Sequence, residues 1–577
     1  MAKTATKGRG SLANRLAMWR AMRAAPASGF TSQPEPRSIG LFARGKQMIA
    51  GNFMFAGRVV EAPGKAIWDV ALTEDGQTDH CHGFVWLDDL AAVGDGAARL
   101  RAQAWTWDWI ARFGAGKGPG WTPDLTGRRL IRWINHAPLL LTARDRAQSD
   151  AYYRSLSAQV VYLSRCWSHA APGLPRFESL TGLIYAGLAL TGLAARIDPA
   201  VAALADECAR EIDDMGGIPT RNPEELLEVF TLLTWAVQAL SEAGRNPPLA
   251  LVAALERIAP TLRALRHADG GLARFQGGGR GIEGRLDQAL AAAGVRPGPP
   301  TSAGLAMGYA RLAAGRTTVI LDAASPPDGR AGLCAHASTA AFELTSGRRP
   351  LIVSCGSGVS FGADWRRAGR ATPSHSTLAV EGYSSSRLEA GDGPEAMIDR
   401  AQVSALRQNP GPDGTHIFIA HTGWSVTHGL GHARDLVLSG DGRKLTGTDK
   451  LGAFTAVERI RFEKLLTKSQ LQGVGLAVRF HLHPDVDAAL DMGGSAVSLA
   501  LKSGEIWVFR HDGHAKLALE PSVFLEKGRL KPRATRQIVL FGRAMELETQ
   551  IGWTLAKAQD TALAIRDLDR DDIPVLP

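Results

Sequence analysis

The stretch AAGVRPGPPTSAG, residues 292–304, separates two parts of the chain that differ in hydrophobic periodicity. Before it, EELLEVFTLLTWAVQALSEAG (224–244) and LALVAALERIAPTLRALR (249–266) carry apolar residues at the spacing of amphipathic helices. After it, short segments such as TTVILDAA (317–324) follow the period of about two that is typical of β-strands. Because Pro and Gly interrupt regular structure, this stretch predicts the boundary between a helical domain and a β domain.

The helical spacing begins at Trp105 and is interrupted by Gly and Pro clusters, for example GAGKGPGWTPDLTG (114–127) and GRNPP (244–248). Such breaks are typical of helices joined by short loops. The sequence contains no exact repeat, so it does not indicate a solenoid. We predict a helical domain over residues 46–300, preceded by a basic, disordered tail over residues 1–45. A membrane-surface helix and an export signal are the functional alternatives for this tail.

The C-terminal part contains short apolar segments at regular intervals from Gly315 onward. SGDGRK (439–444) and KSGEI (502–506) have the composition of hairpin turns. These features predict an antiparallel β-sandwich or a stack of antiparallel sheets over residues 301–577. A run of helices followed by a run of strands makes the chain an α+β multidomain protein.

The 577-residue chain has a formal net charge of +9, from 66 Lys and Arg against 57 Asp and Glu. This balance favours an acidic partner, which could be nucleic acid, an anionic membrane surface or a polyanionic glycan. Because the basic residues form no recognised nucleic-acid module, we expect no nucleic-acid partner. The oligomeric state stays open, a dimer included.

No run of residues approaches the roughly 18 consecutive apolar residues of a membrane span, so the sequence predicts no transmembrane segment. Arg15, Arg20 and Arg23 interrupt every place where a signal peptide could have its apolar core, which indicates a cytoplasmic location. Five cysteines are too few and too scattered for a disulfide framework. They are Cys81, Cys166, Cys208, Cys334 and Cys355.

One group of residues has the composition of a metal site. Cys334 and His336 are two residues apart and would project from one face of a strand, while Cys355 and His375 lie in the next two segments. If those segments are neighbours, two thiolates and two imidazoles suit a tetrahedral zinc ion. The alternative is that the cysteines pack as small apolar side chains.

Loops of the helical part carry side chains that suit a sugar-binding site. Aromatic faces stack on sugar rings, and Arg pairs with carboxylate or sulfate groups in fork geometry. The candidates for substrate binding are Trp121, Arg132, Trp133, Asn135 and His136. For Trp133, the alternative is a place in the hydrophobic core.

Arg221 and Asn222, in GGIPTRNPEELLE (216–228), are two more candidates for this sugar site. The same residues can instead begin a helix. Asn222 would then be the N-cap, Pro223 would occupy the first turn, and Glu225 would complete a capping box.

Several longer motifs together resemble one known family. They are HGFVWLDDLAAVGD (82–95), GPGWTPDLTGRRLIRWINHAPLLL (118–141), GLIYAGLAL (182–190), GGIPTRNPEELLEVF (216–230), AHASTAAFELTSGRRPLIVSCGSG (335–358), WRRAGRATPSHSTLAVEG (365–382), HARDLVLSGDGRKLTGTDKL (432–451) and RFHLHPDV (479–486). The chain resembles the bacterial heparinase II/III family of polysaccharide lyases. This resemblance implies an incomplete (α/α) toroid followed by stacked antiparallel β-sheets.

Lyases of that family cleave uronic-acid polysaccharides by β-elimination, in which a base removes the proton next to the carboxyl group. The resemblance therefore implies a carbon–oxygen lyase that degrades an acidic polysaccharide, such as a glycosaminoglycan or another uronate, often in the periplasm. It implies catalytic roles for His336, His375, Arg221 and Asn222, a substrate-binding role for Arg370, and a structural zinc ion.

The chain also departs from the family pattern. Cys334 replaces the first of two histidines, Ser338 replaces an aspartate, and Ser354 replaces another polar group. The element that brings the family's catalytic tyrosine reads RNPEEL (221–226), without tyrosine, and LPRFESLTGL (174–183) lacks the expected Asn-His pair.

Two functions are consistent with this mixture of match and departure. The first is a divergent lyase whose base is Tyr185, Tyr383 or a histidine within residues 421–432. The second is a non-catalytic protein that binds an acidic glycan and has kept the family fold.

Overall fold

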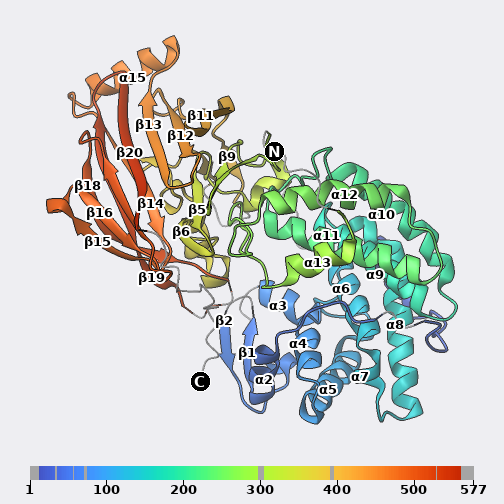
Figure 1. Ribbon diagram of the computed structural model, residues 1–577. Coiled ribbons are helices and arrows are strands. Elements are labelled where there is room, and N and C mark those ends of the chain that lie inside the picture. Colours follow the sequence, from blue (N-terminus) through green and yellow to red (C-terminus); the bar gives the residue numbers. More distant parts are fainter. Residues whose placement is uncertain are drawn as a thin grey trace.

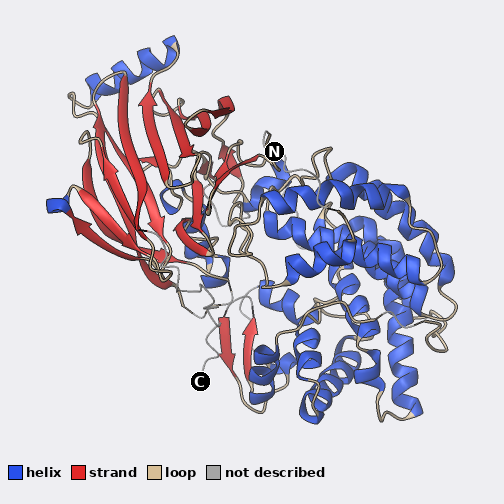
Figure 2. Cartoon of the chain, viewed as in Figure 1, coloured by secondary structure: helices blue, strands red, loops and turns tan. Residues whose placement is uncertain are grey.

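The computed structural model describes residues 12–32, 35–55, 58–70, 75–296, 304–389, 395–527, 529 and 531–559. Helices gather in one half of the molecule and strands in the other, in the order that the periodicity predicts (Figure 1). Figure 2 shows the same division by secondary structure. The predicted α+β architecture is therefore confirmed.

The N-terminal half consists mainly of α-helices. Within the described ranges these are α1 (Leu12–Ala21), α2 (Phe42–Ala50), α3 (Asp75–His82), α4 (Trp86–Val93), α5 (Gly96–Phe113), α6 (Pro123–Asn135), α7 (Ala137–Leu141), α8 (Arg146–Cys166), α9 (Leu174–Ala189), α10 (Ile197–Glu211), α11 (Pro223–Glu242), α12 (Leu249–Ala264) and α13 (Arg285–Ala293). A small hairpin, β1 (Asn52–Phe55) and β2 (Arg58–Glu61), packs against α2 and α3 and was not predicted.

Local sequence signals account for the starts of several helices. Asp95 accepts a hydrogen bond from the backbone N–H of Ala98 at the start of α5, and Asp145 caps α8 within a capping box. Asn222 caps α11, as the helix-start interpretation predicts, with Pro223 in the first turn. Glu225 makes no return bond to this cap, because its carboxylate accepts a hydrogen bond from Thr220 Oγ1 at 2.9 Å.

Helices α6 and α9 approach each other through two glycines. A Cβ atom on Gly127 would stand 2.3 Å from the backbone oxygen of Glu178, and one on Gly182 would stand 2.6 Å from the Cα of Gly127. Only glycine allows the two backbones to lie this close. Nearby, four indole rings fill the core of the helical half: Trp86, Trp105, Trp109 and Trp133 are all buried.

The structure of the N-terminal segment differs from the disorder predicted for residues 1–45. Residues 1–11 lie outside the described ranges, but α1 packs on α8 with Ala17 and Ala21 buried. The backbone N–H of Ala27 donates to Ser157 Oγ at 2.7 Å, and that of Thr31 donates to the Ala189 carbonyl at 2.8 Å. The predicted disorder is therefore wrong for the described part of residues 1–45. Ala17 and Ala21 are spaced i, i+4 and lie on one face of α1, and their small side chains let this helix lie close to α8.

The C-terminal half contains two large antiparallel sheets. Its strands are β3 (Tyr309–Ala314), β4 (Thr317–Asp322), β5 (Phe342–Ser346), β6 (Arg349–Val353), β7 (Leu378–Val380), β8 (Arg387–Leu388), β9 (Met397–Asp399), β10 (Val403–Gly411), β11 (Gly414–Trp424), β12 (Leu430–Ser439), β13 (Lys444–Gly452), β14 (Val474–Leu482), β15 (Asp487–Asp491), β16 (Ala496–Ala500), β17 (Ile506–His511), β18 (Lys516–Phe524), β19 (Arg533–Ala544) and β20 (Glu548–Gln559). Two short helices, α14 (Ala363–Arg370) and α15 (Ala456–Lys468), interrupt them.

The strand order is β10-β11-β12-β13-β20-β17-β16-β15 in one sheet and β18-β19-β14-β6-β5-β4-β3 in the other, where β7 also pairs with β14. Apolar side chains from both sheets, among them Leu344, Leu436 and Phe480, form the core between them. The strands β8 and β9 form a separate ribbon. Within the described ranges, no helix combines the length and the apolar character that crossing a membrane requires.

Candidate functional site

The two halves of the molecule meet at a fully buried carboxylate, Asp322, at the end of β4. Its Oδ1 atom pairs with Arg221 Nη2 from the helical half. Its Oδ2 atom accepts hydrogen bonds from Gln276 Nε2 at 2.9 Å and from Ser338 Oγ at 2.6 Å. One carboxylate thus joins the start of α11, the loop before α13 and the segment before β5.

Arg221 is held in place by the β half. Its guanidinium donates to the carbonyl oxygens of Met307 (3.1 Å), Gly308 (3.0 Å) and Ser325 (2.9 Å), while the Tyr309 hydroxyl donates to the Arg221 carbonyl at 2.6 Å. Burial alone would lower the pKa of Arg221, but the neighbouring carboxylate of Asp322 outweighs it and the pKa is raised.

The backbone of Arg221 has φ of 53°, in the left-handed region that is unfavourable for residues other than glycine. Such strain persists where surrounding contacts hold it. The structure therefore places Arg221 as a fixed part of the domain junction, and the next residue, Asn222, as the cap of α11.

His336 and His375 are brought together, as their shared place in the predicted site requires. Their ring centroids lie 5.3 Å apart, and both side chains are buried. His375 Nδ1 lies 3.1 Å from Ser354 Oγ, and the backbone N–H of His336 donates to Gln276 Oε1 at 2.8 Å. His336 Nδ1 and His375 Nε2 have no hydrogen-bond partner in the part of the chain that the structure describes.

Burial lowers the pKa of both imidazoles, that of His375 to about 4. Both rings are therefore neutral at pH 7, and each has an unused ring nitrogen. Chemically they could accept a proton, but their exposed fractions of 3% and 0% leave no open face for a polymer.

The predicted zinc ligands do not converge. Cys355 Sγ lies 3.4 Å from Nδ1 of His481, a residue outside the predicted set, and Cys334 is exposed. Across the described ranges, no three His, Cys, Asp or Glu side chains are grouped so that they could hold a metal ion. Ser354, in the place of a family polar group, bonds the His375 ring instead of offering a carboxylate ligand. These residues do not fit a tetrahedral zinc site.

Cys355 and His481 form a buried pair of their own. Burial alone would raise the pKa of Cys355, but the adjacent imidazole of His481 outweighs burial, and the pKa of Cys355 is lowered. Burial alone would lower the pKa of His481, but the adjacent Cys355 outweighs burial, and the pKa of His481 is raised. The His481 ring also lies 2.8 Å from both Ser522 Oγ and the Pro373 carbonyl.

The predicted sugar-binding residues of the helical half belong to a separate network. Arg132 Nε donates to Asp88 Oδ2 at 3.0 Å, and His136 Nε2 lies 2.8 Å from Asp88 Oδ1. Trp133 is buried among the indole rings described above, in agreement with its core interpretation, and Trp121 donates its indole N–H to the Phe113 carbonyl at 2.8 Å.

Asn135 and Arg370 are also buried. Neither amide atom of Asn135 has a partner among the described residues. Arg370 donates to the carbonyls of Ala335 at 2.8 Å and Gly332 at 3.1 Å, so it holds the segment that leads into His336. A direct role in substrate binding stays a prediction for the six candidates. Among the described residues, the Asn135 amide and the Trp133 indole N–H have no hydrogen-bond partner, whereas the polar groups of the other four are already bonded within the protein.

The residues proposed as alternative bases also make contacts within the protein. Tyr185 accepts a hydrogen bond from Arg37 Nη1 at 3.2 Å. The Tyr383 ring contacts His428, with centroids 4.7 Å apart. His421 and His432 are buried and lie in line with Asp449, with ring nitrogens 3.1 Å apart and His432 Nε2 2.7 Å from the carboxylate.

An open pocket of about 630 Å³ lies between the α10–α11 loop and the start of the β half. Its lining combines apolar side chains with the acidic residues Glu211, Asp213 and Asp214 and with the basic residues Arg210 and Arg221. Glu211 is bridged by Arg330 from the β half. The pocket is thus at the domain junction, but its three carboxylates outnumber its two guanidinium groups, and this balance disfavours a polyanion.

Sequence reasoning missed Asp322 and Gln276, the residues that bond most directly to the candidates. TTVILD ends in an acidic residue directly after a strand, which was the available signal for Asp322. Gln276 lies in the glycine-rich stretch FQGGGRG (275–281), whose composition gives no signal for a buried polar contact. In the structure a Cβ on Gly278 would stand 2.4 Å from Asn222 Oδ1, so this loop packs tightly on the α11 cap.

The chain is similar to polysaccharide lyases and also to a protein whose name does not refer to a lyase. Residues 296–554 match the family model "Heparinase II/III-like, C-terminal". The chain is 31% identical over 490 residues to FtsZ-localized protein C of Caulobacter vibrioides (strain NA1000 / CB15N), covering 83% of this chain and 81% of that protein.

Two solved structures share the fold. Heparinase III has a TM-score of 0.66 at 12% identity and covers 94% of this chain and 89% of its own. A mutant of the heparan sulfate lyase HepC from Pedobacter heparinus has a TM-score of 0.57 at 14% identity, covering 95% and 88%. These matches confirm the predicted toroid followed by antiparallel sheets.

Proposed function

The chain belongs to the heparinase II/III family, and we propose that within this family it binds an acidic glycan without cleaving it. The observation that carries the proposal is the state of Arg221 and Asn222, the residues at the family's catalytic element. Both are committed to the protein's own structure, one to the Asp322 junction and the other to the cap of α11.

β-Elimination makes specific demands on a site. A base must reach the proton beside the uronate carboxyl group, and a cation or hydrogen-bond donor must stabilise the charge that develops. The cation of Arg221 is neutralised by Asp322 and surrounded by carbonyl oxygens. His336 and His375, which could act as bases, are enclosed. Binding of the intact glycan, without cleavage, requires neither a free cation at Arg221 nor an accessible base at His336 or His375.

Two features support an acidic glycan as the ligand. The chain has a net charge of +9, and the solved structures that share its fold include proteins named for heparin and heparan sulfate. A fold can be kept while the chemistry of its site changes, so these names suggest the ligand class and not the reaction.

A lyase assay on a panel of uronic-acid polysaccharides tests the proposal. We expect no growth of the ultraviolet absorbance of an unsaturated uronate product, while isothermal titration calorimetry detects binding of at least one member of the panel. Heparinase III serves as the positive control for product formation. Sustained product formation that H375A abolishes would show instead that the chain is a divergent lyase.

A second candidate function is association with FtsZ, which the name of the Caulobacter relative suggests. The observation that favours it is an identity of 31% across 83% of this chain, well above the identity to any lyase structure named above.

Co-sedimentation with FtsZ filaments tests this second role. We expect the purified chain to enter the pellet with GTP-assembled FtsZ and to stay in the supernatant with unassembled FtsZ, because localisation at a polymer requires affinity for its assembled form. Serum albumin provides the control for trapping. Equal amounts of the chain in the pellet with and without GTP would count against the role.

A further inference from the structure

A second polar pocket lies away from the domain junction, at the turns of two neighbouring hairpins. It has a volume of about 440 Å³, and its lining includes Arg311, Arg316, Thr317, Thr318, Gly347 and Arg348. Asp322 and Thr317 occupy opposite ends of β4, so the rise of a β-strand separates them by about 17 Å. The pocket is thus distinct from the Asp322 junction.

Arg311 is the fixed element of this pocket. Its Nη1 donates to the carbonyls of Ala264 at 3.0 Å and Arg266 at 2.6 Å, and its Nη2 donates to Thr318 Oγ1 at 3.4 Å. These acceptors are neutral, and among the described residues no carboxylate pairs with this cation. Burial lowers the pKa of Arg311, which reflects a partly buried charge without a counter-ion.

The geometry of Arg311 leaves donors for a ligand. A guanidinium has five N–H donors, and the contacts above use both of Nη1 and one of Nη2. The Nε–H and the second N–H of Nη2 have no acceptor in the described part of the chain. Two such donors match the two oxygens of a carboxylate, sulfate or phosphate group.

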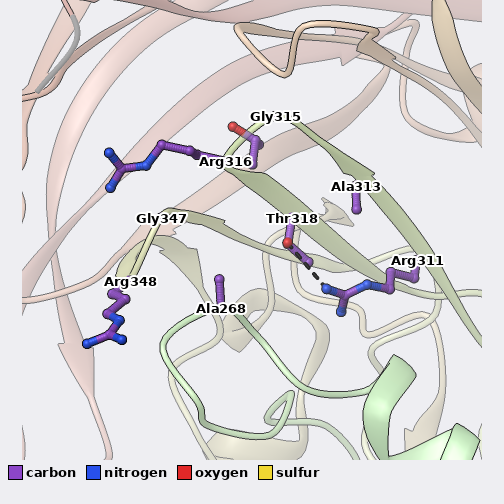
Figure 3. Close-up of a pocket in the computed structure, with 9 residues that line it drawn as sticks. Ala268, Arg311, Ala313, Gly315, Arg316, Thr318, Gly347 and Arg348 are labelled. Atoms are coloured by element: carbon purple, nitrogen blue, oxygen red, sulfur yellow. Dashed lines mark hydrogen bonds between the residues drawn. The ribbon is translucent and has the colours of Figure 1, made fainter. Parts of the chain in front are cut away.

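Two further cations border the same pocket. Arg316 lies in the β3–β4 turn and Arg348 in the β5–β6 turn; both are exposed, and neither has an ion-pair partner among the described residues. Figure 3 shows Arg311 on one side of the pocket and Arg316 and Arg348 on the other. A Cβ on Gly347 would stand 2.4 Å from Arg316 Nη2, so the glycine lets this guanidinium lie against the neighbouring turn.

The acidic residues next to the pocket are already bonded. Asp441, whose carbonyl abuts Gly315, accepts hydrogen bonds at its carboxylate from Ser439 Oγ and the Arg443 N–H. Asp269, which follows Ala268, accepts from the Gly271 N–H and faces Arg280. None of the described residues that line the pocket is acidic, so the three arginines give this concave site an excess of positive charge.

We infer that this pocket is an oxyanion-binding site, which takes a carboxylate, sulfate or phosphate group on the free donors of Arg311, while Arg316 and Arg348 supply positive charge at its border. Its volume is in the range of small-molecule sites and exceeds what a single inorganic anion fills. The inference does not depend on the proposed glycan function, because the donors recognise the oxyanion and not the molecule that carries it.

Calorimetric titration of the full chain tests the site with two probes, a heparin-derived tetrasaccharide and inorganic phosphate. We expect the R316S/R348S variant to bind about tenfold more weakly than the wild type, because the positive charge that borders the pocket and attracts an anion is lost. R99S/R536S is the matched control, since it removes two exposed arginines elsewhere and should bind as the wild type does.

The two probes separate the sources of the oxyanion. Tetrasaccharide binding that depends on Arg316 and Arg348 identifies a saccharide ligand, whereas dependence for phosphate alone identifies a small free oxyanion; both support the site. Binding of both probes that is unchanged in R316S/R348S and in R311M, or no binding of either probe to the wild type, overturns it. If R311M fails to fold, as seen by circular dichroism, the double variant decides.

Discussion

Replacing Asp322 with Asn is expected to lower the free energy of unfolding by about 3–5 kcal/mol, because it leaves the Arg221 cation buried without its counter-charge. The carboxylate has no exposed surface, and it also accepts hydrogen bonds from Gln276 and Ser338. An amide would turn one N–H toward these donors. Urea denaturation followed by circular dichroism measures the loss.

D328N is the matched control for this change. Asp328 also pairs with an arginine, Arg400, but its side chain is 74% exposed. Exposed ion pairs contribute at most about 1 kcal/mol, so the control should unfold close to the wild type. A D322N variant as stable as D328N would mean that the junction does not depend on this carboxylate.

Replacing Asp449 with Asn should have an effect of similar size inside the β half, about 3–5 kcal/mol. Both oxygens of this buried carboxylate pair with Arg434, Oδ1 also lies 2.7 Å from His432, and the Trp553 indole donates to Oδ2 at 2.9 Å. The variant leaves Arg434 buried without a counter-charge. Urea denaturation at pH 7 measures the loss.

The pH dependence of D449N gives a second measurement. Burial raises the pKa of Asp449, but Arg434 and His432 outweigh it, so the folded-state pKa lies below that of the unfolded chain. A lowered pKa contributes stability that is present above the unfolded-state value of about 3.9 and is lost as the pH falls through the folded-state value. The stability difference between wild type and D449N should therefore shrink below about pH 4. A difference that stays constant down to acid unfolding would contradict the role of this charge.

The partners of Arg221 and Cys355 show which features of the candidate site the local sequence could not predict. The pattern around residues 216–230 made Arg221 and Asn222 candidates for a sugar site or for the start of a helix, and Asn222 is the cap of α11. This pattern could not predict that Arg221 turns toward Asp322, 101 residues further along the chain. Likewise, Cys355 was grouped with His375 by sequence distance, whereas the pairing of β14 with β6 brings His481 beside it.

The basic tail illustrates the same limit for the fold. Charge and the lack of an apolar core predicted disorder, and the helix α1 forms because α8 offers a surface on which Ala17 and Ala21 become buried. An isolated helix of this length is marginal in water, so the tertiary contact decides its state.

The sequence by itself determined the division into a helical half and a sheet half and the cap of α11. These features follow from periodicity, Gly and Pro positions and side-chain bonds to nearby backbone, all of which act over a few residues. Only the tertiary structure decided which charged groups meet, whether Arg221 is free for chemistry, and where cations remain unpaired, as around Arg311. The reason is that burial and the approach of distant segments set the partners and pKa values of these groups, and neither is encoded in local spacing.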